Sequence, residues 1–195
     1  MTLLFACLGL FLFSILAGVV SLFIVFFFRD PDRKHDIDQE KAVLTPADGT
    51  ILEIKQLEGD DNPLGGPAIK ISIFMSLFNV HVNRVPIGGT IKQISYHQGK
   101  FFSADLDKAS EHNENNRITL KTSDSRIIVF VQIAGLIARR IVCWIKEGDR
   151  VSTGQRFGLI RFGSRLEVYL PGDSKITAQE RQKVRAGETV IGYLL

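Results

Sequence analysis

The first 28 residues of the chain contain no charged side chain, and residues 3–28 form a nearly continuous apolar run. About 20 apolar residues are enough for a helix to cross a bilayer, so this run can span a membrane with room for tilt. A cleaved signal peptide normally has a basic start, a shorter apolar core and a small-residue cleavage site, none of which is evident here. Residues 1–28 are therefore predicted to be a retained transmembrane helix.

Basic side chains follow this helix and do not precede it. Arg29, Arg33 and Lys34 come directly after the apolar run. The positive-inside rule then places the remainder of the chain in the cytoplasm, as a single-pass protein of the cell membrane. Residues 29–41 are rich in charge and are interpreted as a linker, which leaves residues 42–195 for one domain.

Composition excludes several functions. The net charge is only +3, and no basic block indicates a nucleic-acid partner. The two cysteines and four histidines are scattered without the spacing of a disulfide framework or a zinc site, so no metal is expected.

The domain at 42–195 has the pattern of many short strands joined by glycine turns, which predicts a mainly β fold. Apolar and polar residues alternate along 68–78. Further strands are expected at 43–51, 118–121 and 126–133, a long loop at 96–117, and either helix or strand at 137–145.

An internal repeat refines this fold prediction. Residues 151–157 and 184–190 both contain a valine, two intervening residues, a glycine and a polar residue. This pattern resembles the turns of lipoyl- and biotinyl-type domains, so the predicted fold is a barrel-sandwich-like domain after one transmembrane helix. A swinging-arm carrier would need a displayed lysine between the repeats, and the sequence there reads Gly163-Ser164-Arg165 instead.

The Gly163-Ser164 step offers a specific chemistry. The Ser164 hydroxyl can attack the Gly163 carbonyl and convert the peptide bond to an ester, and elimination can then break the chain. The serine half would end as a pyruvoyl group, a ketone made from the protein itself. Gly-Ser is also a common turn dipeptide, so it is a weak signal alone.

A serine hydroxyl needs a base to attack an amide, and His81 is the best candidate by residue type. Asp48 could orient that imidazole. Each residue also has a simpler explanation, because an aspartate before glycine usually forms a turn and a histidine after an apolar strand is usually structural.

The ordered set of motifs resembles the phosphatidylserine decarboxylase family in its short bacterial and archaeal form. The matching segments cover nearly the whole chain and lie at residues 27–31, 46–49, 74–86, 113–117, 132–141, 154–158 and 162–165.

This resemblance implies a proenzyme that cuts itself between Gly163 and Ser164. Residues 1–163 would become a membrane-attached β chain and residues 164–195 an α chain capped by pyruvoyl, with the two fragments held together as a heterodimer. The pyruvoyl group would form a Schiff base with the amine of phosphatidylserine or archaetidylserine and act as the electron sink for loss of carbon dioxide.

The family's Asp-His-Ser set for self-cleavage corresponds to Asp48, His81 and Ser164. Longer members carry a second histidine where this chain has Arg84, so His81 serves cleavage, decarboxylation or both. Arg84, Arg139 and Arg140 are candidates for binding lipid phosphate, with solvated surface charge as the alternative.

Two other functions are compatible with the residues taken alone. One is a serine peptidase using Asp48, His81 and Ser164, although the chain lacks a Gly-x-Ser-x-Gly elbow at Ser164. The other is a membrane-tethered carrier or adaptor β-sandwich. The expected partner is the phospholipid substrate in the membrane, and a homo-oligomer is left open.

Overall fold

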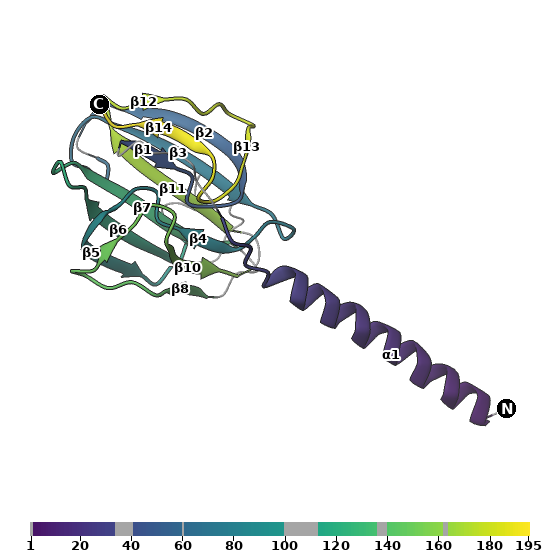
Figure 1. Ribbon diagram of the computed structural model, residues 1–195. Helices are drawn as coiled ribbons and strands as arrows, with labels where there is room; N and C mark the ends of the chain where they lie inside the picture. The colour runs from purple at the N-terminus through teal and green to yellow at the C-terminus, as the bar shows by residue number, and fades with distance from the viewer. Residues whose placement is uncertain (1, 34–40, 60, 100–112, 136–139, 162–163) are drawn as a thin grey trace.

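The computed structural model of the protein describes residues 2–33, 41–59, 61–99, 113–135, 140–161 and 164–195. One long helix, α1 (Thr2–Phe27), projects from a domain built of strands, and the C-terminus lies at the end of that domain away from the helix (Figure 1).

Helix α1 is long and apolar enough to cross a membrane. Its span Gly9–Phe27 covers 19 residues with a mean hydropathy of 2.8, and only 6% of it is buried against the protein. The hydroxyls of Ser14 and Ser21 donate to the carbonyls of Leu10 and Ala17, so the polar side chains of this span are satisfied within the helix. The helix ends within one residue of the predicted boundary.

An eight-stranded sheet forms the centre of the domain. All its neighbouring strands are antiparallel, in the order β13–β2–β3–β11–β7–β6–β5–β9. The strands are β2 (Gly49–Leu57), β3 (Ala68–Met75), β5 (Gly89–His97), β6 (Asn115–Lys121), β7 (Ile127–Ala134), β9 (Arg150–Val151), β11 (Ser164–Pro171) and β13 (Lys183–Val184).

Two small sheets complete the fold. One contains β1 (Ala42–Leu44), β14 (Val190–Tyr193) and β12 (Lys175–Ile176), and the other contains β4 (Val82–Arg84), β10 (Arg156–Ile160) and β8 (Ile141–Cys143). The predicted fold class is confirmed, since a mainly β, curled-sheet domain follows one N-terminal apolar helix.

The main core covers one face of the large sheet. Alternate residues of β3, β7 and β11, such as Ile71, Phe130 and Val168, are buried there, and Phe130 meets Phe157 of β10 edge-on at a centroid distance of 4.9 Å. The other face carries a smaller apolar cluster with Val131 and Tyr169. Residues on β11 therefore alternate between two distinct buried environments.

The internal repeat corresponds to two similar strand–turn–strand units, β9–β10 and β13–β14. Their glycines, Gly154 and Gly187, have φ of 75° and 72°, a left-handed conformation that other residues rarely adopt. The amide of Gly154 donates to the Val85 carbonyl and that of Gly187 to the Thr45 carbonyl. A Cβ on Gly187 would lie 3.7 Å from the Gly154 Cα, so the two turns are in contact.

The predicted loop at 96–117 was too long. Strand β5 extends to His97 and β6 begins at Asn115, while residues 100–112 lie outside the described residues. The parts of these strands inside the predicted loop are Tyr96-His97 and Asn115-Asn116-Arg117, which contain no alternation of apolar and polar residues. For residues 137–145 the described part contains strand β8, which settles the open alternative there in favour of strand.

Candidate functional site

Ser164 is the first residue of β11, the fourth strand of the large sheet. It pairs with Met75 of β3 on one side and with Ala134 of β7 on the other. Its side chain is fully buried, and its hydroxyl donates to the Met75 sulfur at 3.4 Å. A thioether is a weak acceptor, so within the part of the chain that the structure describes the hydroxyl forms no strong hydrogen bond that would oppose its reaction. Gly163 lies outside the described residues.

His81 lies between a tight turn and strand β4, and only 3% of it is exposed. Its Nδ1 is 2.9 Å from the carbonyl oxygen of Asn79, and its ring packs on the Phe27 ring at a centroid distance of 4.1 Å. Because a carbonyl only accepts, the proton of the neutral ring is on Nδ1, which leaves the lone pair on Nε2. Nε2 is buried without a hydrogen-bond partner among the described residues.

Burial lowers the pKa of His81 from 6.5 to about 4. The nearby positive charge of Arg29 lowers this pKa further, while the hydrogen bond to Asn79 acts in the opposite direction. The imidazole is therefore neutral at pH 7, and its Nε2 is available to accept a proton.

Asp48 lies in the turn between β1 and β2. One carboxylate oxygen accepts from the Arg33 guanidinium at 2.9 Å, and the other accepts from the backbone amide of Ala186 at 2.8 Å. The hydrogen bonds of Asp48 thus go to these two groups and not to His81. The structure buries all three residues of the predicted Asp-His-Ser set without joining them by hydrogen bonds.

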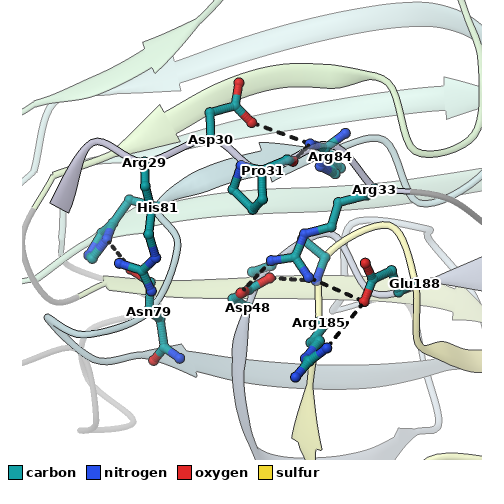
Figure 2. A network of polar contacts seen from close by, with 12 residues as sticks. Arg29, Asp30, Pro31, Arg33, Asp48, Asn79, His81, Arg84, Arg185 and Glu188 are labelled. Atoms are coloured by element: carbon teal, nitrogen blue, oxygen red, sulfur yellow. Dashed lines mark hydrogen bonds and ion pairs between the residues drawn. The ribbon is translucent and has the colours of Figure 1, made fainter. Parts of the chain in front are cut away.

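The segment after α1 packs against His81, Asp48 and Arg84. Figure 2 shows Arg29 beside His81, while Asp30 contacts Arg84 at 3.3 Å and Arg33 contacts Glu188 at 3.2 Å in addition to Asp48. Residues 29–33 were predicted to belong to a linker, but they are bound to the β domain.

Arg84 is buried among protein groups. Its guanidinium donates to the carbonyls of Gly154 at 3.0 Å and Pro31 at 2.9 Å, and it pairs with Asp30. Burial lowers the pKa of this guanidinium. Its contacts hold the glycine turn against the segment after α1, whereas Arg140 is exposed and Arg139 lies outside the described residues.

Two buried amides that the sequence interpretation did not select lie close to Ser164. Gln132 of β7 donates to the side-chain oxygen of Asn83 at 2.9 Å, and the Asn83 amide is 3.6 Å from the Met75 sulfur. Ser164 and Asn83 thus contact the same sulfur atom. The sequence feature that could have pointed to Gln132 is its place as a polar residue within the apolar run of 127–134.

A buried ion pair lies on the opposite face of β11. The Arg165 guanidinium contacts the Glu167 carboxylate and the Ser72 hydroxyl, each at 2.9 Å, and the Tyr169 hydroxyl donates to Glu167 at 2.7 Å. Burial, together with the Glu167 charge, raises the pKa of Tyr169. Arg165 was noted in the sequence only as the neighbour of Ser164.

A pocket of about 950 Å³ also lies on this opposite face of the sheet. Glu53, Lys70, Arg117 and Tyr169 are among its lining residues. Because neighbouring residues of a strand point to opposite faces, this pocket does not contain the Ser164 hydroxyl. The described residues contain no group of three potential metal ligands.

Comparisons with known proteins identify the family. The family model described as phosphatidylserine decarboxylase matches residues 20–192. The chain belongs to the phosphatidylserine decarboxylase family. A relative named phosphatidylserine decarboxylase proenzyme from Syntrophus aciditrophicus is 51% identical over 92% of this chain and 83% of its own length. Proteins of the same name from Desulfotalea psychrophila and Ralstonia pickettii are 49% and 48% identical, over 91% and 90% of this chain and 82% and 80% of their own lengths.

Family membership confirms the resemblance on which the sequence interpretation rested. The two alternative functions, a serine peptidase and a carrier or adaptor domain, are not favoured by this membership. The relatives' names contain the word proenzyme, which agrees with the expectation of a precursor.

Proposed function

We propose that this chain is a membrane-bound phosphatidylserine decarboxylase proenzyme, which converts the serine head group of its phospholipid to ethanolamine and carbon dioxide. We further propose that it matures by cleavage between Gly163 and Ser164. The observation that carries this proposal is the Ser164 hydroxyl, which is fully buried at the start of β11 and whose one hydrogen-bond partner among the described residues is a weak acceptor, the Met75 sulfur.

The proposed cleavage uses the chain's own atoms. The Ser164 oxygen forms a bond to the Gly163 carbonyl carbon while the carbon–nitrogen bond breaks, which gives an ester and a free amine. Removal of the Ser164 α-proton then expels the Gly163 carboxylate. Water hydrolyses the resulting enamine, by way of its imine form, and ammonia leaves. His81 suits the first step, because its neutral Nε2 accepts a proton at pH 7.

The surroundings of Ser164 fit a pyruvoyl group. Conversion of the hydroxyl to a ketone removes the weak side-chain bond to Met75. Loss of the Ser164 nitrogen as ammonia also removes the backbone amide at the first paired position of β11, while the pairing of β11 from Arg165 onward is kept. The side-chain amide of Asn83 contacts the same sulfur as the Ser164 hydroxyl, and the Gln132 amide donates to Asn83, so both belong to the polar groups around the site. When present, the ketone supplies an electron sink for the electrons left by the departing carboxylate.

The two fragments would remain one folded unit. Strand β11 pairs with β3 over eight residues and with β7 over six, all within the sheet. Residues 164–195 also supply β12, β13 and β14, which are split between two sheets. The cut would therefore leave the core intact and produce a heterodimer of residues 1–163 and 164–195.

The proposed location is the cell membrane, with the β domain on the cytoplasmic side. Helix α1 has the length and hydropathy of a membrane span. Arg29 and Arg33 follow it directly, which is the charge expected on the cytoplasmic side of a membrane helix. This location holds the site near the lipid head groups, whether the tails are diacyl or archaeal ether chains.

Intact mass and denaturing electrophoresis test the proposal. The uncut chain has a mass of 21.8 kDa, whereas the mature protein should give two fragments, the smaller starting with a blocked residue 164. The Ser164→Ala variant should stay uncut and release no carbon dioxide from phosphatidylserine, while the exposed Ser152→Ala control should behave as the parent. An active protein that remains one chain with Ser164 unmodified would refute the proposal.

A further inference from the structure

Phe78 is the most exposed large apolar side chain among the described residues of the β domain. It is 71% exposed, whereas Phe130 and Phe157 of the same domain are fully buried in the core. A single exposed apolar residue is common on protein surfaces. The position of Phe78 relative to the membrane helix is what distinguishes it.

Arg29 joins Phe78 to the end of α1. Its guanidinium donates to the Phe78 carbonyl at 2.7 Å and to the Phe26 carbonyl at 2.8 Å, and it lies 3.9 Å from the centre of the Phe26 ring. The apolar span of α1 ends at Phe27, so a membrane-spanning α1 would leave the hydrocarbon at this level. Phe78 therefore lies close to the end of α1, because the same guanidinium bonds the backbones of both Phe26 and Phe78.

The turn that carries Phe78 is closed by its own hydrogen bonds. The Asn79 amide donates to the Ser76 carbonyl at 3.1 Å, and the Asn79 side-chain oxygen accepts from the Ser76 amide at 2.8 Å and from its hydroxyl at 2.7 Å. These bonds, with the contact to Arg29, fix the turn beside the helix. Phe78 is therefore exposed on a turn whose backbone is held in place by hydrogen bonds.

We propose that the turn Ser76–Asn79 enters the bilayer interface beside α1, with the Phe78 ring among the upper acyl chains, as a second point of membrane contact. The partner is the phospholipid bilayer itself. This inference rests on the proposed function, because it requires α1 to span the membrane. An aromatic ring at the level where a membrane helix ends lies in the region that aromatic side chains prefer.

The same turn is bonded to His81. The Asn79 carbonyl accepts from His81 Nδ1, and the His81 ring packs on Phe27 at the end of α1. If Phe78 inserts, His81 is held by two elements that contact the bilayer, the end of α1 and the turn. Together they would fix the distance of His81 from the membrane surface. Two contacts fix the tilt of the domain, which one helix alone does not.

Fluorescence of the full chain in phosphatidylcholine vesicles tests the insertion. Trp144 is the only native tryptophan, so Trp144→Phe provides a background for single tryptophan probes. Phe78→Trp should show a blue-shifted emission and lose fluorescence when the lipids carry bromine on the upper acyl chain. The control Leu195→Trp, 60% exposed at the end of the domain away from α1, should show neither change (Figure 1).

A third probe separates this inference from the proposed location. Phe23→Trp lies within the apolar span and reports insertion of α1. Quenching of Phe23→Trp without quenching of Phe78→Trp would overturn the second contact and leave the membrane helix standing. No quenching at Phe23→Trp would overturn both.

Activity on vesicles gives an independent readout. Phe78→Ser should raise the KM for phosphatidylserine in vesicles and leave kcat unchanged, because it weakens placement at the membrane without touching the reacting groups. Phe78→Leu should restore the parent KM. A KM for Phe78→Ser equal to that of the parent would contradict the proposal.

Discussion

Protonation of His81 should destabilise the fold as the pH falls. Burial holds its pKa at about 4 in the folded protein, against an ordinary value of 6.5. The unfolded chain therefore binds this proton more readily than the folded chain. The stability that comes from a neutral His81 is complete above pH 6.5 and is lost as the pH falls toward 4. The whole shift corresponds to about 3 kcal/mol, and the part lost between pH 7.5 and pH 5 is about 2 kcal/mol.

Urea unfolding of the full chain in detergent micelles measures this effect. The Ser164→Ala background keeps the protein as one covalent chain, and His81→Gln within it removes the titrating ring. Other carboxyl and amine groups titrate in both proteins, so their contributions cancel in the difference. The difference in unfolding free energy between the two proteins should shrink by about 2 kcal/mol between pH 7.5 and pH 5.

Two measurements test whether the pKa of His81 is lowered in the folded protein. A difference that stays constant within about 0.5 kcal/mol would show that His81 is not held neutral by its surroundings. In the Ser164-containing chain, the same low pKa predicts that self-cleavage continues at pH 5 and declines only near pH 4, because Nε2 stays unprotonated until then. The matched control is His97→Gln, which removes an exposed imidazole from β5.

Two further predictions concern buried ion pairs, both measured in the uncut background. Arg33→Gln leaves the Asp48 carboxylate buried with only the Ala186 amide, and should lower the unfolding free energy by about 3 kcal/mol, while Arg33→Lys should recover part of it. An Arg33→Gln protein as stable as its parent would contradict this. Arg165→Met removes the cation that faces the buried Glu167 carboxylate and should cost about 3 to 5 kcal/mol, whereas Arg165→Met with Glu167→Met should be near the parent. Equal losses in the single and double variants would show that lost packing, not the loss of the opposite charge, is responsible.

The elements that could be predicted from sequence are those with strong local patterns. The apolar run predicted α1 to within one residue at its C-terminal end, because a membrane span needs only length and hydropathy. Alternation along 68–78 predicted β3, and the repeated glycines predicted the paired turns at Gly154 and Gly187. Each of these signals can be read within one continuous segment of the sequence, the longest being the apolar run at residues 3–28.

The site depended on contacts that no local pattern contains. Asp48 bonds to Arg33 and to Ala186, which is 138 positions away in the sequence. Residues 29–33 looked like a linker because their charges resemble solvated ones, yet the structure pairs Asp30, Asp32 and Arg33 with the β domain. Buried Gln132 and Arg165 were missed for the same reason, since their partners come from other strands.

The place of β11 inside the large sheet has a consequence for how long such a molecule can work. A strand bonded along both edges cannot be exchanged for a fresh copy unless the surrounding sheet opens. Under the proposed maturation, each chain would make its reactive ketone once and could not have it renewed. An enzyme whose ketone was reduced or otherwise consumed would then need to be degraded and synthesised again, so decarboxylating capacity would depend on continued translation.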